Sequence, residues 1–150
     1  KGKQMKMSTK GRYGLRIMLE LALNYGQKAV IADTIAQNQQ ISANYIHLLV
    51  KTLRDAGLIN AARGPNGGYL LARPPADINV LQIVVALEGK IRVVDCAAGG
   101  EGCIRTPECV VREVWEKLNR SVEDTLKEIT LEQLVLRHGQ ALRAQHDYQI

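Results

Sequence analysis

The chain has 150 residues and a mass of 16.6 kDa, the size of a single domain, which excludes a protein made of two full-sized enzyme domains. Its 46% hydrophobic and 23% charged residues allow a buried core, and the 4% aromatic content predicts aliphatic packing. The sequence has neither an apolar run long enough to span a membrane nor the pattern of a signal peptide, so we expect a cytoplasmic protein that does not contact a membrane.

Charge is distributed unevenly along the chain. Residues 1–75 contain 11 basic and 3 acidic side chains, a net charge of +8, whereas residues 76–150 contain 9 basic and 12 acidic ones, a net charge of −3. This asymmetry favours a polyanionic partner for one face of the protein. A basic surface that is merely solvated would have the same composition.

The N-terminal half predicts three helices followed by a hairpin. Apolar residues repeat every three or four positions in three segments separated by polar breaks, over about residues 8–26, 31–37 and 42–57. Ser42 is a suitable N-cap for the third helix, and Gly57 is a suitable end. The next segments predict a strand, a glycine-rich turn and a second strand, over residues 58–63, 64–68 and 69–72. Together they predict a winged helix-turn-helix domain over residues 5–73, with residues 1–4 set aside as a short extension.

The C-terminal half predicts a linker, a long helix and a short helix. Asn79 can cap a helix that leads into a glycine-rich segment, and the apolar stripe that follows predicts a long helix over about residues 107–126. Thr130 and Gln133 have the spacing of a capping box for a last short helix over residues 131–136. We therefore divide this half into a linker helix and cysteine loop (74–106), the long and terminal helices (107–136) and a flexible tail (137–150).

The third predicted helix carries residue types that can read DNA bases. In a helix-turn-helix the second of the paired helices enters the major groove, and its N-terminal residues reach the base edges. The residues at that position here are Ser42, Asn44, Tyr45 and His47. Asn44 can form paired hydrogen bonds with adenine and Ser42 can donate or accept, although both are also ordinary capping residues.

The hairpin and the basic residues around it can contact phosphates. Arg63 precedes the hairpin tip, which can lie along a minor groove, and Gly64 lets the backbone approach the phosphates closely. Contacts independent of base sequence are expected from Lys10, Arg12, Tyr13, Lys51 and Arg54. Taken singly, each of these is more often a solvated surface residue, but together they predict double-stranded DNA as the partner.

Three cysteines, Cys96, Cys103 and Cys109, lie within 14 residues in the acidic half. In a cytosolic chain an odd, clustered set favours metal or redox chemistry over a disulfide framework. Thiolates bind iron-sulfur clusters and zinc, and a flexible loop lets them converge on a metal. Zinc and three unrelated free thiols stay open as alternatives, although structural zinc sites usually show closer cysteine pairs.

Several segments resemble the IscR-type iron-sulfur cluster regulators, which are Rrf-type winged-helix transcription regulators. The similarity runs from about residue 5 to residue 135 and is strongest in residues 8–13, 41–54, 63–71 and 129–135 and in the three-cysteine loop. The resemblance implies a homodimeric bacterial regulator whose long helix crosses between subunits as a dimerisation helix. It also implies a labile 2Fe-2S cluster whose gain or loss changes promoter choice. By position, the cluster ligands would be Cys96, Cys103 and Cys109, and the residues facing DNA would include Ser42, Asn44, His47 and Arg63.

Two features depart from the pattern of that family. Its fourth cluster ligand is a histidine three residues after the last cysteine, where this chain has Arg112, which stays protonated and is a poor iron ligand. Some relatives use an N-terminal carboxylate, but the matching residue here is Arg12; a nearby glutamate, His138, His146 or solvent is left for this role. The family's selectivity residue on the reading helix is a glutamate, whereas this chain has His47, which can donate to a base and gain a charge at mildly acidic pH.

Three other functions are compatible with parts of the sequence. A nitric-oxide or redox sensor would hold a 4Fe-4S cluster or zinc at the same cysteines. A thiol-redox enzyme is disfavoured because the chain has no Cys-x-x-Cys, nucleophile elbow or P-loop, so we expect a protein without catalytic residues. A dimerisation adaptor would lack the salt-dependent DNA affinity that phosphate contacts produce.

Overall fold

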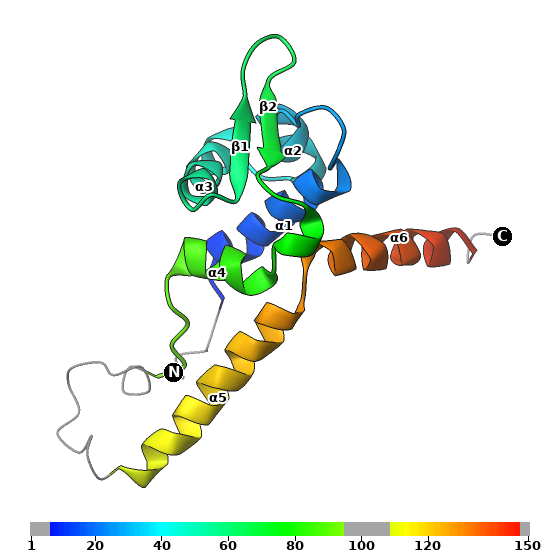
Figure 1. Ribbon diagram of the computed structural model, residues 1–150. Helices are drawn as coiled ribbons and strands as arrows, with labels where there is room; N and C mark the ends of the chain where they lie inside the picture. The colour runs from blue at the N-terminus through cyan, green and yellow to red at the C-terminus, as the bar shows by residue number, and fades with distance from the viewer. Residues whose placement is uncertain (1–6, 95–108, 148–150) are drawn as a thin grey trace.

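The computed structural model describes residues 7–94 and 109–147. Its elements in chain order are α1 (Thr9–Leu23), α2 (Ala32–Gln39), α3 (Ala43–Asp55), β1 (Ile59–Ala62), β2 (Gly68–Leu71), the 3-10 turn η1 (Pro75–Asp77), α4 (Val80–Glu88), α5 (Val110–Glu128) and α6 (Leu131–Asp147). Figure 1 shows α1 to α4 and the β1–β2 hairpin gathered into one body, from which α5 and α6 extend in different directions. The predicted fold class, a mostly helical winged helix-turn-helix with a two-stranded wing and a long C-terminal helix, is confirmed.

Polar side chains cap the helix starts that the sequence predicted. The hydroxyl of Ser8 accepts a hydrogen bond from the Lys10 amide at 3.1 Å and so begins α1. At α6 the Thr130 hydroxyl accepts from the Gln133 amide at 3.2 Å, and the Gln133 side chain accepts from the Thr130 amide at 3.1 Å. Asn79 and Gln82 form the same capping box at the start of α4. These reciprocal bonds satisfy amides that have no partner inside a helix.

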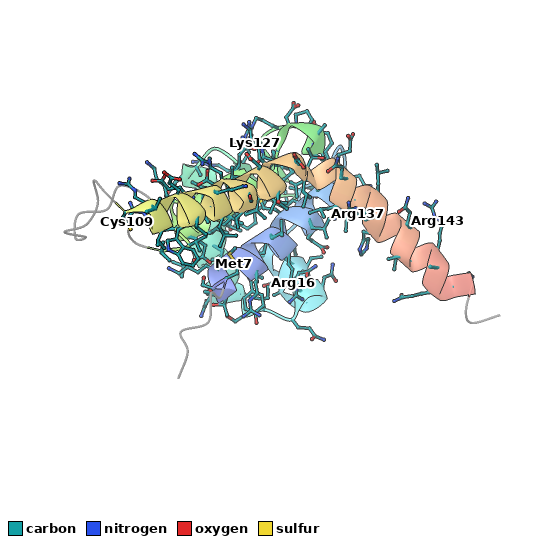
Figure 2. All side chains as sticks on the ribbon, turned by 90° about the horizontal axis from the view of Figure 1, so that it is seen from below. Met7, Arg16, Cys109, Lys127, Arg137 and Arg143 are labelled. Atoms are coloured by element: carbon teal, nitrogen blue, oxygen red, sulfur yellow. The ribbon has the colours of Figure 1, made fainter. Side chains whose placement is uncertain are left out.

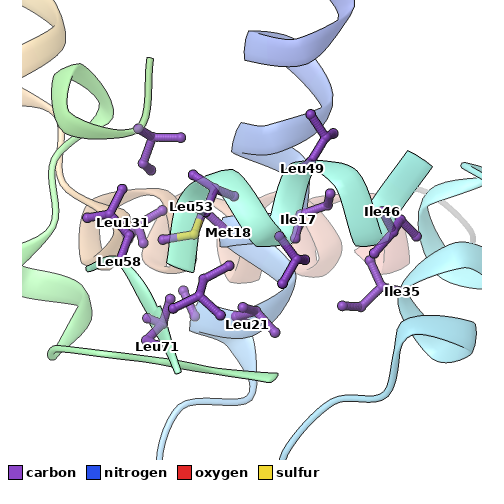
Figure 3. Close-up of a cluster of buried hydrophobic side chains, with 14 of the residues drawn as sticks. Ile17, Met18, Leu21, Ile35, Ile46, Leu49, Leu53, Leu58, Leu71 and Leu131 are labelled. Carbon is purple, nitrogen blue, oxygen red and sulfur yellow. The ribbon is translucent and has the colours of Figure 1, made fainter. Parts of the chain in front are cut away.

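An aliphatic core lies between α1, α3 and the first turn of α6 (Figure 3). Ile17, Ile46 and Leu53 are 0% exposed, and so is Leu131 at the start of α6. Burial of each such side chain contributes about 1.5–3 kcal/mol. Because Leu131 belongs to this cluster, the core extends beyond the predicted domain boundary at residue 73 and includes the start of the last helix.

The start of α6 is held to the body by backbone hydrogen bonds as well as by burial. The Val80 amide donates to the Ile129 carbonyl at 2.8 Å, and the Leu131 amide donates to the Ile78 carbonyl at 2.9 Å. These two bonds flank an antiparallel bridge between Asn79 and Thr130. The orientation of α5 and α6 is therefore fixed at their junction.

Helix α1 approaches α4 closely because glycine faces it. A Cβ placed on Gly14 would lie 2.0 Å from Cδ1 of Leu87, a distance that no side chain could occupy without movement. On the other side of α1, the buried carboxylate of Glu20 accepts from Asn38 Nδ2 at 2.7 Å and from Gln39 Nε2 at 2.8 Å. These contacts bring α2 and α4 against the same helix.

The apolar stripe predicted for the long helix divides between two faces of α5. Trp115, Val122 and Leu126 are half-buried, and α5 packs against α4. Val111 and Val114, by contrast, are 57% and 58% exposed. None of the residues of α5, all of which are described, is buried.

The last helix is longer than predicted. The sequence predicted a short helix over residues 131–136 and a flexible tail over 137–150, whereas α6 continues to Asp147. The predicted end at residue 136 was wrong: Gly139, which follows it, costs a helix only about 1 kcal/mol, and strong helix formers come after it. Figure 2 shows that the second half of α6, with Arg143, projects clear of the body. None of the described helices is both long enough and apolar enough to cross a membrane.

Candidate nucleic-acid interface and cysteine segment

Helix α3 presents one polar face to solvent and buries the other. Asn44, His47 and Lys51 repeat at intervals of three and four residues and are all exposed. Between them, Ile46 and Leu49 belong to the buried core. The face predicted to read DNA is therefore the face that the fold leaves free.

The N-terminus of α3 is organised by its cap. The Ser42 hydroxyl oxygen accepts from the Tyr45 amide at 3.3 Å, which makes Ser42 the N-cap, while its side chain stays exposed. Tyr45 is half-buried and packs against the core. Of these two predicted contact residues, Ser42 thus has a structural role, and its hydroxyl hydrogen is still free to donate outward.

Helix α1 is joined to the start of α3 through aromatic side chains. Thr9 Oγ1 and the Tyr45 hydroxyl lie 3.2 Å apart, and the rings of Tyr13 and Tyr45 meet edge to face with centroids 6.0 Å apart. The guanidinium of Arg16, which the sequence analysis did not single out, lies 5.6 Å from the centre of the Tyr13 ring. Tyr13 thus supports the interface through packing.

The predicted phosphate-contacting residues lie around this face and are exposed, apart from half-buried Tyr13. Lys10 and Arg12 are in the first turn of α1, and Arg63 and Gly64 follow β1. Arg54 lines a concave surface between α3 and the wing. Lys51 forms a loose ion pair with Asp55 at 3.9 Å on the outer face of α3 (side chains 70% and 63% exposed).

Glycine is present at three positions of the wing for different structural reasons. Gly64 has a φ of +97° and open space where a side chain would be. A Cβ on Gly67 would lie 2.8 Å from the Ala62 carbonyl oxygen, and one on Gly68 would lie 2.6 Å from the Val30 carbonyl oxygen. Gly67 and Gly68 are therefore required inside the wing, whereas only Gly64 is free to approach a partner.

Tyr69 is a site residue that the sequence analysis missed. Its hydroxyl lies 3.0 Å from Nδ1 of His47, and the two rings meet edge to face with centroids 6.3 Å apart. The Tyr69 backbone exchanges two hydrogen bonds with Val30, of 2.9 and 3.0 Å. No local pattern indicates this contact, because it joins residues 22 positions apart in the sequence.

Only one of the three predicted metal ligands lies within the described residues. Cys109 is a free, half-buried cysteine that immediately precedes α5 as its N-cap residue, at the outer end of that helix in Figure 2. Cys96 and Cys103 lie outside the described residues. Among residues 7–94 and 109–147, no three histidine, cysteine or acidic side chains are grouped as a metal site.

The chemistry of the donor set fits a thiolate-bound group but leaves it short of one ligand. Cys109 makes no capping hydrogen bond through its side chain. Arg112, at the position where the resemblance would place histidine, donates from Nε to Glu116 at 2.6 Å. His138 and His146 are on α6.

A second missed residue connects the end of α4 with the start of α1. Glu88 is the last residue of α4, and its carboxylate accepts from the Ser8 hydroxyl and from the Gly11 amide at 2.9 Å. A carboxylate at a helix N-terminus offsets the partial positive charge of the unpaired amides. The end of α4, which precedes the cysteines in the sequence, is thereby held to the helix that carries Lys10 and Arg12.

Comparison with known proteins identifies one family, and the relatives include proteins named CymR and IscR. The family model described as "Rrf2: Iron-dependent Transcriptional regulator" matches residues 7–137. The chain is similar to the regulator CymR of Bacillus subtilis (40% identical over 130 residues, 87% of this chain and 89% of CymR). It is also similar to the regulator IscR of Photorhabdus laumondii (34% identical over 131 residues, 87% of this chain and 79% of IscR).

The similar solved structures also include a CymR and an IscR. The structure of CymR, described as the global cysteine regulator of B. subtilis, has a TM-score of 0.78 at 38% identity and covers 89% of this chain and 98% of that one. The structure of T. potens IscR has a TM-score of 0.76 at 37% identity and covers 91% of this chain and 90% of that one. These relatives are transcriptional regulators, which confirms the prediction that the chain is not an enzyme.

Proposed function

The chain belongs to the Rrf2 family of transcriptional regulators, and we propose that it acts as a homodimer that binds operator DNA under the control of a 2Fe-2S cluster at its cysteine segment. The observation that carries the DNA-binding part is the exposed face shared by α3, the wing and α1. Asn44 and His47 lie on it together with the cations Lys10, Arg63 and Arg54. Such a face combines possible base contacts with phosphate contacts.

The proposed dimer rests on the uncovered apolar stripe of α5. Val110, Val111, Val114 and Leu118 are 75%, 57%, 58% and 39% exposed and line one side of the helix. A second copy of α5 would bury these side chains and would set the distance between the two reading helices. Two-fold regulators bind half-sites about one helical turn apart, so that this distance decides which operators fit.

The proposed cluster rests on the three cysteines and on the IscR relatives. Cys96, Cys103 and Cys109 would supply three thiolate ligands, and the bound group would supply redox-sensitive ligation of the segment before α5. Arg112 does not provide the fourth ligand, because its guanidinium carries no free lone pair and is bound to Glu116.

Glu88 offers a route from this segment to the DNA-binding face. It ends α4 directly before the cysteine-bearing stretch, and it accepts hydrogen bonds from Ser8 and Gly11 at the start of α1. Ligation that shifted Glu88 would therefore shift the first turn of α1, where Lys10 and Arg12 lie. We propose that this contact couples the cysteines to DNA affinity.

Salt-dependent binding to double-stranded DNA tests the main proposal. We expect the affinity for a pool of duplexes, measured by fluorescence anisotropy, to fall steeply as salt is raised. Arg63→Glu should weaken binding by at least about 10-fold and lower the salt slope by about 1 per subunit. The matched charge reversal Arg143→Glu, on the projecting part of α6, should leave both unchanged. Equal behaviour of the two variants would contradict the assigned face.

The cluster is tested separately by anaerobic spectroscopy. Reconstitution of the full chain with iron and sulfide should give a brown protein with visible absorbance, and Cys103→Ala should remove that absorbance. Arg112→His should make the reconstituted absorbance last longer in air if the missing ligand limits cluster stability. A colourless wild-type protein would end the cluster proposal and leave DNA binding standing.

A second candidate is a regulator whose cysteines act without an iron-sulfur cluster. Two observations favour it: Arg112 is paired with Glu116, and CymR is among the relatives. In that case metal analysis of the reconstituted protein would show no iron, while thiol oxidation would change its affinity for DNA.

A further inference from the structure

We propose that Tyr69 is a positioning residue that fixes the hydrogen-bonding state of His47, so that His47 presents Nε2–H as a donor to guanine in the major groove. This inference rests on the proposed DNA-binding function and names the base chemistry that the α3 face selects. It assigns sequence selection to a contact between the wing and α3.

The geometry joins one exposed reading residue to one anchored side chain. His47 is exposed on α3, and its Nδ1 lies 3.0 Å from the hydroxyl of Tyr69. Because the two ring nitrogens of imidazole point in widely different directions, Nε2 is directed away from that hydroxyl. Tyr69 is held on β2 by its two backbone hydrogen bonds with Val30 and by its pairing with Ala61. A rigid strand therefore orients a side chain on the reading helix.

We assign the direction of this hydrogen bond from the chemistry of the two groups. The phenol O–H is a donor, and a neutral imidazole nitrogen is a strong acceptor. The 3.0 Å distance joins the Tyr69 hydroxyl oxygen to Nδ1 of His47 and fits the hydroxyl as the donor. When Nδ1 accepts, the ring hydrogen of a neutral histidine lies on Nε2. Tyr69 therefore makes neutral His47 an Nε2 donor.

None of the described residues that line the concave surface beside the His47 ring is acidic. The concave surface beside the ring is lined by Arg54 from the same helix, Tyr69 and Gly64 from the wing, and Ala32 from the start of α2. Lys51, one turn further along α3, is paired with Asp55, which is two turns from His47. A surface that carries Arg54 and no acidic lining residue favours an acceptor on the partner.

Guanine is the base that matches a single fixed donor best. Its major-groove edge carries two neighbouring acceptors, N7 and O6, whereas adenine and thymine each combine one acceptor with a donor or a methyl group. Cytosine offers a donor, which an Nε2–H group would repel. A histidine free to exchange tautomers could accept from cytosine or adenine as well, so that the fixed state is what creates the preference.

The test compares the wild-type full chain with Tyr69→Phe and with the matched control Tyr25→Phe. Tyr25 follows α1 and is 47% exposed. Each protein selects duplexes from a random library, and the enrichment of each base is read position by position. We expect wild type to prefer guanine at one position of each half-site by about 10-fold, the value of one hydrogen bond. Tyr69→Phe should reduce that preference to about 2-fold, and Tyr25→Phe should leave it unchanged.

A further readout separates positioning from a loss of folding. Replacing the selected guanine with 7-deazaguanine should cost wild type several-fold in affinity and the variant almost nothing.

The outcomes distinguish a failure of the inference about Tyr69 from a failure of the proposed DNA-binding function. If Tyr69→Phe keeps the full preference, or if wild type selects no guanine, Tyr69 does not position His47 and the inference is overturned. If no protein enriches any duplex and binding shows no salt dependence, the proposed function itself fails.

Discussion

The two halves of the described chain differ in how completely they bury their apolar side chains. Helix α1 buries seven of its residues, including Ile17 and Leu21, whereas α5, four residues longer, buries none. Both helices are amphipathic, but the apolar face of α1 is covered by the rest of its own chain. The difference teaches that the winged body holds its shape by internal packing, while α5 leaves an apolar stripe exposed, which the proposed dimer would bury.

The largest effect should come from a cavity in the winged body. Leu53 is 0% exposed, so Leu53→Ala should lower the free energy of unfolding by about 3 kcal/mol through lost burial and the cavity left behind. Urea unfolding followed by circular dichroism measures this. Leu48→Ala, on the same helix with 54% exposure, serves as the control and should change stability by less than about 1 kcal/mol. A similar loss in both variants would break the contrast between the two faces of α3.

A charge on the exposed stripe of α5 should act on association instead. Val114→Asp would bury an unpaired carboxylate in the proposed dimer and should weaken association by about 2 kcal/mol, roughly 30-fold in Kd. Sedimentation equilibrium measures this, and the unfolding of the winged body should not change. Arg120→Asp alters the charge more but lies on the polar side of α5, so its dimer should persist. A monomeric wild-type protein would contradict the proposed interface directly.

The close approach of α1 and α4 gives a smaller and more specific prediction. Gly14→Ala should destabilise the body by about 1.5 kcal/mol, because the new methyl group would meet Leu87. Combining it with Leu87→Ala should cost less than the sum of the two single changes, since the shortened side chain leaves room for the methyl group. Thermal unfolding of the four proteins measures the coupling, and strict additivity would show that the two positions do not meet.

The smallest change in stability is expected at Glu88, where a substitution should also weaken the proposed coupling between the cysteines and DNA affinity. Glu88→Gln keeps the shape but removes the negative charge that faces the α1 N-terminus, which should cost about 0.5 kcal/mol of unfolding free energy. It should also reduce the difference in DNA affinity between the protein with ligated cysteines and the protein without. Lys90→Gln, two residues further on, is the control. An unchanged difference would place the coupling route elsewhere.

Caps and periodicity allowed most of the body to be predicted. Ser42, Asn79 and Thr130 were recognised as helix starts, and the structure confirms the predicted capping bonds. Helix α6 was predicted to end at residue 136, whereas it continues through Gly139 because strong helix formers surround that glycine. The same approach recognised an apolar stripe on α5 but not its division into a half-buried face and an exposed face, because both lie on one continuous helix.

The candidate site could be predicted only in part. Residue types and charge marked Asn44, His47 and Arg63 as candidates, and all three are exposed on the described interface. Tyr69 and Glu88 could not be found in this way, because a tyrosine in a strand and a glutamate at a helix end are ordinary residues until their distant partners are known.

The sequence by itself determined most of the helices, the wing, the basic half and the clustering of three cysteines along the chain, since these depend on residue type and on intervals of a few positions. The tertiary structure alone decided which surfaces meet: Gly14 lies against Leu87, and His47 lies against Tyr69. The physical reason is that periodicity and capping act within about four residues, whereas close packing and hydrogen bonding between elements depend on where the folded chain brings remote segments together.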